Sequence, residues 1–153
     1  MSKTNQLFQL AQKIASERCG FFEIKGPSKG DHDTNAFMAE LRKRAKKVFQ
    51  ENFSEQRICG DNGLAVDFYF PEEETIVEIA LSIRNPQSEF EHDLFKSLLA
   101  KEQGYKVTHL VFVTKPRASD HHKQPSSQAI ISWVEQKHGI DVDIRELTRT
   151  LSH

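Results

Sequence analysis

The stretch AVDFYFPEEETIVEIA, residues 65–80, decides the fold. Its alternating apolar residues predict two short strands, and the turn PEEE between them predicts an antiparallel hairpin. Pairing Phe70 with Thr75 across that turn puts Asp67 directly opposite Glu78. Directly opposed residues share a face of the sheet, with Cβ atoms about 4.5–5.5 Å apart, and like charges so placed repel each other. A hard cation such as Mg²⁺ between the carboxylates is one good reason to keep them there, so this hairpin is the predicted reactive centre.

The alternation assigns a face to each side chain of the hairpin. One face is continuously apolar and suits a core, with Val66, Phe68 and Phe70 on the first strand and Val77, Ile79, Leu81 and Ile83 on the second. The other face carries Asp67 and Glu78 among small or mixed residues, as a recessed polar site requires. An alternative stays open, in which the sheet has one solvent-exposed face and two acids fall on it without a metal.

Composition bounds the class of protein. The 153 residues predict a single domain, 1–153, with an amino-terminal helix over 1–20 and a core over 35–138. The charged fraction of 28% is typical of a globular protein, and no apolar run approaches a membrane span, so no membrane partner is expected. The start of the chain has no apolar signal-peptide region, which predicts a cytoplasmic location. Cys19 and Cys59 lack metal-ligand spacing and are expected to be reduced structural residues.

Hydrophobic periodicity predicts the remaining elements. Helices are expected at 4–19, 35–53, 87–102 and 125–138, followed by a short carboxy-terminal helix; strands are expected at 21–24, 57–59, 107–113 and 140–144; and loops are expected at 26–33 and 115–123. The strands before and after the 87–102 helix can lie parallel through that crossover. The predicted class is therefore α/β, with a central mixed β-sheet flanked by helices on both faces.

This order of elements, with an acid on each hairpin strand, resembles the PD-(D/E)XK superfamily of nucleases. The superfamily motif is an Asp, a variable gap, and Glu-x-Lys on the next strand. Here Asp67 is followed after ten residues by Glu78-Ile79-Ala80, so Ala80 stands where the superfamily has its lysine. The resemblance covers residues 35–138 and implies a restriction endonuclease-like core. It also implies that Asp67, Glu78 and the Ile79 carbonyl hold Mg²⁺ or Mn²⁺, with Glu40 of the long helix facing the metal. The alternative for Glu40 is a simple i,i+4 pair with Arg44.

The superfamily lysine orients or activates the attacking water. The 87–102 helix, which follows the second hairpin strand, carries candidates to replace it. At about 100° per residue, Glu91 falls within an arc of large apolar residues and is a candidate third catalytic residue facing the two acids. That arc contains Phe90, Leu94, Leu98 and Phe95. Equally open is a capping box in which Glu91 closes the helix start at Ser88. Lys96, on the outer side of this arc, is the weaker substitute for the missing lysine, and Lys101 points inward near the far end.

Two basic stretches provide candidate DNA contacts on a chain of net charge −1. They contain Arg42, Lys43, Lys46 and Lys47 in the first stretch, and Lys115, Arg117 and Lys123 in the second. A solvated helix face accounts for the first stretch almost as well.

The leading functional hypothesis is a metal-dependent nuclease that hydrolyses phosphodiester bonds in DNA. The resemblance implies a restriction-type or repair-type endonuclease that works as a homodimer, because cutting both strands needs two centres. The alternative is a nuclease fold without catalysis that binds DNA or a protein partner, and Ala80 is its main support. A third possibility is an α/β interaction domain with no nucleic-acid role, which the near-neutral charge favours.

Overall fold

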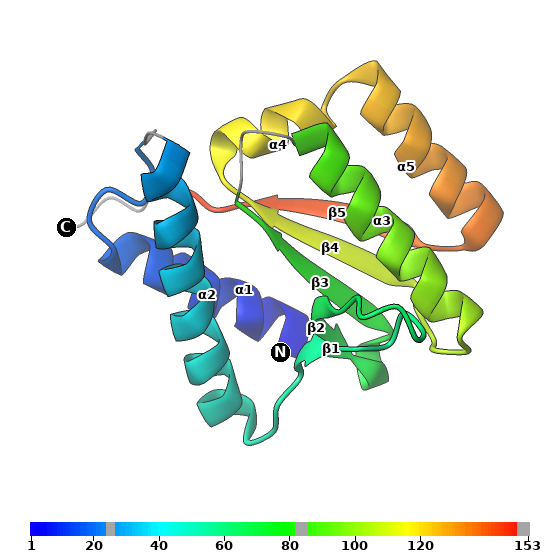
Figure 1. Ribbon diagram of the computed structural model, residues 1–153, viewed down its shortest axis with the longest axis horizontal. Coiled ribbons are helices and arrows are strands. Elements are labelled where there is room, and N and C mark those ends of the chain that lie inside the picture. The colour runs from blue at the N-terminus through cyan, green and yellow to red at the C-terminus, as the bar shows by residue number, and fades with distance from the viewer. Residues whose placement is uncertain (24–26, 82–85, 150–153) are drawn as a thin grey trace.

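A mixed five-stranded sheet forms the centre of the described chain (Figure 1). The computed structural model describes residues 1–23, 27–81 and 86–149, and only the backbone of 27–33. The strands lie in the order of their numbers: β1 Ser54–Gln56, β2 Val66–Phe70, β3 Thr75–Ala80, β4 His109–Thr114 and β5 Asp141–Glu146. β1, β2 and β3 pair antiparallel, whereas β3, β4 and β5 pair parallel. The predicted mixed sheet is therefore confirmed.

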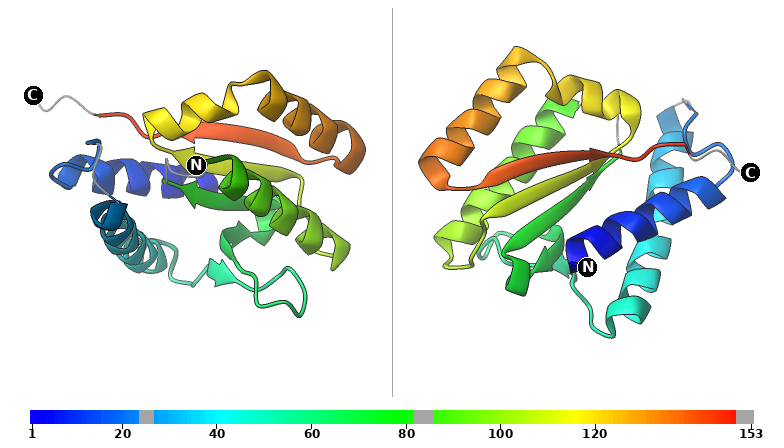
Figure 2. Two further views of the ribbon diagram at one scale, coloured as in Figure 1. Left: turned by 45° about the horizontal axis from the view of Figure 1, so that its top comes forward. Right: turned by 180° about the vertical axis from the view of Figure 1, so that it is seen from behind.

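Helices cover both faces of this sheet, as the sequence predicted. Their bounds are α1 Lys3–Glu17, α2 Pro27–Phe49, α3 Pro86–Glu102, α4 Pro116–His122 and α5 Pro125–His138, with the 3-10 turn η1 at Pro71–Glu73. The right-hand view of Figure 2 shows α1 on the near side of the sheet, with α3 and α5 on the far side. Within the described ranges, none of these helices is both long and apolar enough to cross a membrane.

Two apolar cores hold the sheet between these helices. The first lies under α1 and α2 and includes Leu7, Phe37, Leu41, Phe68, Phe70 and Val77. The second lies under α3 and α5 and includes Ile76, Phe90, Leu110, Phe112, Val134 and Ile140. Complete burial of one such side chain stabilises a fold by about 1.5–3 kcal/mol, so the hairpin that contributes to both cores is firmly held.

The hairpin has the predicted register. Phe68 pairs with Val77 and Phe70 with Thr75, while η1 and Glu74, at φ 52°, make the turn. The predicted single apolar face is correct for Phe68, Phe70, Val77, Ile79 and Leu81, which lie in the first core or pack against it. It is wrong for Val66, which packs in the second core, and Ile83 lies outside the described residues. The alternation breaks at residue 67, between Val66 and Phe68. There the backbone pairing of the two strands gives way to hydrogen bonds between backbone N–H groups and the side chains of the two acids.

Several predicted boundaries are wrong. Residues 27–33 and 116–122 are helical rather than loops, and in both cases a proline begins the helix, where its fixed φ and missing N–H are tolerated. The strand predicted at 57–59 lies instead at Ser54–Gln56. The strand predicted at 21–24 is a turn as far as residue 23, residue 24 being outside the described residues, and no helix follows β5 up to residue 149.

The hairpin turn also caps the first helix. One carboxylate, that of Glu73, accepts hydrogen bonds from Lys3 N at 2.6 Å, Thr4 N at 3.1 Å and Thr4 Oγ1 at 2.6 Å. Partial burial acts to raise the pKa of Glu73, but the hydrogen bonds from Thr4 and Lys3 outweigh burial and lower it. The acidic turn therefore contributes to the fold, because Glu73 ties the hairpin to α1.

We expect Glu73→Ala to lower the free energy of unfolding by about 1–2 kcal/mol near pH 7, because it leaves orphan N–H groups at the helix start. The folded-state pKa is lowered, so the stabilisation is complete above the unfolded value of about 4.3 and is lost as pH falls through the folded value. Urea unfolding at several pH values measures this. Glu72→Ala is the matched control, because Glu72 is the adjacent residue and its side chain is 85% exposed. Equal losses in both variants would contradict the capping role.

Candidate active site

Asp67 and Glu78 meet where the two hairpin strands begin to separate. Asp67 N donates to Glu78 Oε1 at 2.8 Å, and Ile79 N donates to Asp67 Oδ2 at 2.8 Å. Each carboxylate thus bonds the backbone of the opposite strand in place of a strand–strand hydrogen bond. The prediction that these acids meet across neighbouring antiparallel strands is confirmed, and their in-plane contacts account for the break in alternation at Val66.

A lysine from α3 reaches the same point. Lys96 Nζ lies 2.7 Å from Glu78 Oε2, 2.9 Å from the carbonyl oxygen of Ala65 and 3.2 Å from Asp93 Oδ1. The side chains of Lys96 and Glu78 are only 8% and 1% exposed. The charged lysine therefore sits inside the protein beside the acidic pair, although Ala80 occupies the motif position on β3.

The predicted outward direction of Lys96 is wrong. Measured from Phe90 at about 100° per residue, the buried side of α3 runs from about 240° through zero to about 40°. It carries Lys96, Ser97 and Ala100 as well as Phe90 and Leu94, whereas Phe95 is 53% exposed. The prediction used only large apolar residues to find the inward face, but small side chains let α3 approach the sheet closely there.

The site holds more carboxyl groups than ammonium groups. Three carboxylates, those of Asp67, Glu78 and Asp93, surround one ammonium. Burial, then the charges of Asp67 and Asp93, raise the pKa of Glu78 well above its usual value, against the effect of Lys96. Burial also raises the pKa of Asp67. Burial acts to lower the pKa of Lys96, but Glu78 and Asp93 raise it overall, so the ammonium keeps its charge.

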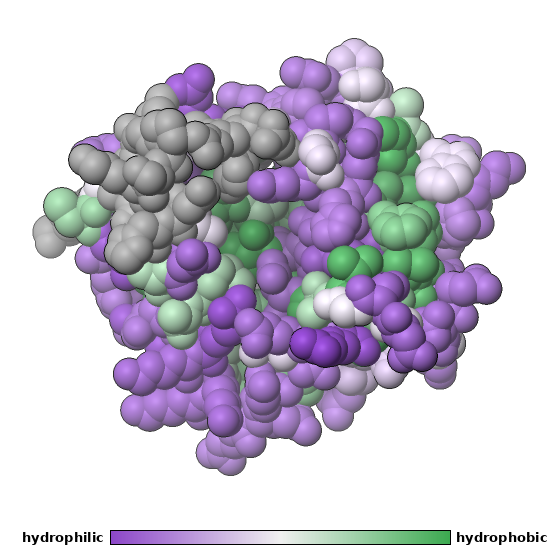
Figure 3. All heavy atoms as spheres, viewed as in Figure 1, coloured by the Kyte–Doolittle hydropathy of each residue, from purple (hydrophilic) through white to green (hydrophobic). Residues whose placement is uncertain are grey.

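These groups line an open cavity of about 290 Å³. Thr34 of α2 forms one wall, α3 forms the other, and the end of β3 forms the floor. Figure 3 shows a hollow on this face between the α2 side and the α3 side, with apolar residues at its bottom. The described lining residues are Thr34, Asp67, Glu78, Ile79, Ala80, Leu81, Glu89, His92, Asp93 and Lys96.

Sequence reasoning missed the polar stripe of α3. Glu89, His92, Asp93 and Lys96 all line the cavity, and their spacing is that of one helix face. That spacing was a usable signal, because four polar residues at i, i+3, i+4 and i+7 form a stripe as regular as an apolar one.

Glu91 and Glu40 do not reach the cavity. Glu91 is exposed and accepts a hydrogen bond from Gln87 Nε2 at 2.6 Å, so the predicted contact with the acidic pair is wrong. The capping alternative also fails, because α3 begins before Ser88. Glu40 Oε1 lies 2.7 Å from Arg44 Nε, one turn along α2, so its predicted metal-facing position is wrong too. In both cases a partner on the same helix takes the carboxylate.

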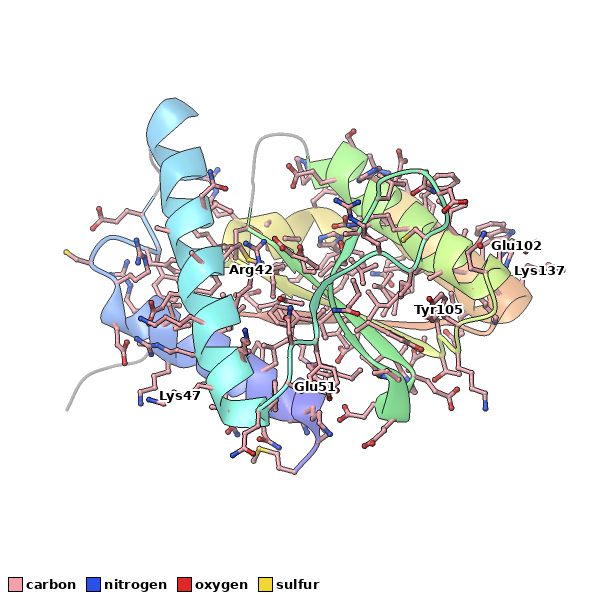
Figure 4. All side chains as sticks on the ribbon, turned by 60° about the horizontal axis from the view of Figure 1, so that its bottom comes forward. Arg42, Lys47, Glu51, Glu102, Tyr105 and Lys137 are labelled. Carbon is pink, nitrogen blue, oxygen red and sulfur yellow. The ribbon has the colours of Figure 1, made fainter. Side chains whose placement is uncertain are left out.

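The basic residues of α2 differ in their surroundings. Arg42 lies on the side of α2 toward the sheet, where it pairs with Glu55 at 3.2 Å and its charge acts to lower the pKa of Asp67, whereas Lys47 lies on the outer side (Figure 4). Lys43 and Lys46 are exposed as well. The lysines are thus free of the core, as expected.

The second basic stretch lies on and beside α4. Lys115 Nζ lies 4.4 Å from the centre of the Phe21 ring, and Lys123 Nζ lies 3.4 Å from Asp120 Oδ1. Arg117 is exposed. Arg117 therefore lies within a helix rather than in the predicted loop, and Lys115 and Lys123 flank the two ends of that helix.

Asp67 and Glu78 are the two side chains of the hairpin that the sequence predicts to hold a metal ion. In the part of the chain that the structure describes, no group of three or more His, Cys, Asp or Glu side chains is arranged to hold a metal ion. Asp67 and Glu78 share the cavity with Ile79, whose carbonyl was the predicted third ligand.

Comparisons of this chain with protein-family models, with curated proteins and with solved structures found no match. The arrangement of Asp67, Glu78 and Asp93 around Lys96 is therefore the basis for inferring a function.

We expect Asp67→Asn to gain stability relative to the wild type as pH rises above about 4 in metal-free buffer. The pKa of Asp67 is raised on folding, so the folded wild type binds more protons than the unfolded chain and loses stability as pH rises through the folded value. Asparagine keeps the oxygen that accepts from Ile79 N but does not titrate. Unfolding at several pH values in EDTA measures the difference. The Glu73→Ala variant must show the opposite trend, and a pH-independent difference at residue 67 would contradict the prediction.

Proposed function

We propose that the chain is a metal-dependent nuclease that hydrolyses phosphodiester bonds in DNA. The observation that carries the proposal is the distance of 2.7 Å between Lys96 Nζ and Glu78 Oε2, with Asp67 hydrogen-bonded across the same hairpin. An Asp, a Glu and a Lys thus converge in one cavity, which is the set of side chains that the PD-(D/E)XK resemblance requires. Lys96 of α3 takes the role that Ala80 cannot fill on β3.

A divalent cation fits the charge and chemistry of this site. Asp67, Glu78 and Asp93 bring three carboxyl groups near one ammonium, and ionised carboxylate and carbonyl oxygens are ligands that Mg²⁺ and Mn²⁺ prefer. Asp67, Glu78 and the Ile79 carbonyl would hold the ion. When bound, it would polarise the phosphate and lower the pKa of a bound water.

The chain's own residues supply the remaining functions. Lys96 keeps its charge and would orient the attacking water or stabilise the charge that develops on the phosphate. The half-buried end of β3 would shield one side of the reacting group from bulk solvent. The exposed lysines of α2 extend along the helix that also provides Thr34 at the cavity wall, so they would hold neighbouring phosphates of a DNA strand.

Double-strand cleavage would use a homodimer, in the manner of a restriction-type or repair-type endonuclease, because one centre cuts one strand. Support for this is the open cavity, which one duplex strand can enter at a time, and the resemblance itself. Analytical ultracentrifugation with and without DNA measures the assembly.

A second candidate is a non-catalytic module that binds DNA or a protein partner. Its support is that the Lys96 ammonium already has three acceptor oxygens within 3.2 Å, one for each of its N–H groups. A lysine so occupied can serve as a permanent substitute for a metal ion. Divalent-ion binding and cleavage separate the two candidates.

We expect the wild type to relax and linearise supercoiled plasmid in Mg²⁺ or Mn²⁺, and Lys96→Met to lower the rate by about 10²–10⁴-fold. Lys101→Met is the matched control, because it removes an exposed lysine from the same helix and should cleave as the wild type does. Adding Ala80→Lys to Lys96→Met should restore part of the rate, since residue 80 lines the same cavity.

Circular dichroism and thermal unfolding establish that the variants compared are folded. Cleavage by Lys96→Met at the wild-type rate would exclude Lys96 from catalysis. A wild type that binds the plasmid but does not cut it in either metal favours the non-catalytic module.

We expect charge reversal of Lys43, Lys46 and Lys47 to weaken DNA binding and to flatten its salt dependence by about 0.9 in slope per lost phosphate contact. These side chains are exposed, so the fold should remain intact. Fluorescence anisotropy with a short duplex, at salt concentrations between about 50 and 200 mM, measures both quantities.

The control reverses the charges of Lys101, Lys106 and Lys137, which are equally exposed. Figure 4 shows Lys137 at the opposite end of the molecule from Lys47. The same loss in both triple variants would reflect net charge alone, and an unchanged slope in the first would leave α2 as a solvated helix face.

A further inference from the structure

Lys96 is fully coordinated by the site it is proposed to serve. An ammonium has three N–H donors, and those of Lys96 have three acceptors at hydrogen-bond or ion-pair distance: Glu78 Oε2, the Ala65 carbonyl and Asp93 Oδ1. The side chain is 8% exposed, so water offers few alternative partners. In this arrangement Lys96 has no N–H left for a substrate or an attacking water.

The oxygen nearest to Lys96 is also the one that a cation would need. Glu78 Oε1 accepts from Asp67 N, and Asp67 Oδ2 accepts from Ile79 N, so the hairpin backbone already occupies one oxygen of each acid. Glu78 Oε2 is the remaining oxygen of its carboxylate, and the Lys96 ammonium is 2.7 Å from it. A divalent ion between the two acids therefore competes with Lys96 for Glu78 Oε2.

Asp93 offers the lysine another partner without any backbone movement. Its carboxylate lies 3.2 Å from Lys96 Nζ, one turn earlier on the same helix, and is 16% exposed. Two cations repel strongly in a partly dehydrated site, which drives the mobile side chain away from the incoming ion. Lys96 has a flexible four-carbon stem, so it can shift from Glu78 toward Asp93 by side-chain rotation.

We propose that the Lys96 ammonium competes with a divalent ion for the cation site of Asp67 and Glu78. When the ion binds, Lys96 leaves Glu78, and Asp93 is the positioning residue that holds the displaced ammonium through their ion pair. The inference rests on the proposed metal site but not on cleavage. It makes ion binding and lysine release one coupled event, so that Lys96 becomes available to a phosphate only in the metal-loaded protein.

Calorimetric titration of Mg²⁺ and Mn²⁺ into the DNA-free full chain tests the competition. Lys96→Met should bind the ion about tenfold or more tightly than the wild type, although it is expected to be the poorer nuclease. Lys101→Met should bind as the wild type does. Unchanged or weaker binding by folded Lys96→Met would overturn the proposal.

A double-mutant cycle tests the role of Asp93. Asp93→Asn should weaken ion binding several-fold in the wild-type background, because the displaced ammonium then lacks a carboxylate. In the Lys96→Met background the same change should have little effect. Equal losses in both backgrounds would mean that Asp93 acts on the ion directly, which contradicts its action through the lysine.

Wild-type protein alone provides a second readout that does not depend on the folding of any variant. The ¹⁵Nζ signal of Lys96, assigned through its side-chain carbons, should shift as Mg²⁺ saturates the site. A signal unchanged at saturation would overturn the proposal. If the wild type binds the ion with a shifted Lys96 signal but does not cleave DNA, the proposed nuclease function fails while this inference stands.

Discussion

The candidate site depends on one buried contact, between Lys96 of α3 and Glu78 of β3. The two charged groups lie 2.7 Å apart with almost no solvent access. Removing one partner of such a pair typically costs about 3–5 kcal/mol, because the other charge stays buried without compensation. Replacing both by apolar residues is often neutral, so stability alone gives no reason to keep this pair. Its position at the floor of an open cavity points instead to chemistry.

This contact also constrains how the hairpin meets α3. The Lys96 side chain reaches Glu78 because the small residues Ser97 and Ala100, both fully buried, let α3 approach the sheet closely. On the other side, Glu78 and Asp67 each bond the backbone of the opposite strand. Helix phase, strand register and side-chain direction are thus linked at one point, and a one-residue slip of the hairpin would place the two acids on opposite faces of the sheet.

The same local rules explain the sequence predictions that were correct and those that were wrong. The hairpin register followed from a four-residue turn between two alternating strands, and the structure confirms it. Lys96 faces the two acids and Glu91 does not, which is the reverse of the prediction, because the helix face was inferred from Phe90, Leu94, Leu98 and Phe95 alone. Phe95 is half exposed, whereas the sheet side is built from small and charged residues. The large apolar residues alone therefore indicated the wrong face, whereas the polar stripe of α3 marks the side of the helix that lines the cavity.

The sequence by itself determined the α/β class, the hairpin and the opposition of Asp67 to Glu78, because these depend on local periodicity and on one short turn. Only the tertiary structure decided that Lys96 reaches Glu78 and that Val66 leaves the first core. The first outcome depends on how closely α3 approaches the sheet, and the second on the contacts that Asp67 and Glu78 make with the opposite strand. Close approach is set by the packing of small residues and by competition among several partners for each charge, and neither is encoded in the spacing of any single segment.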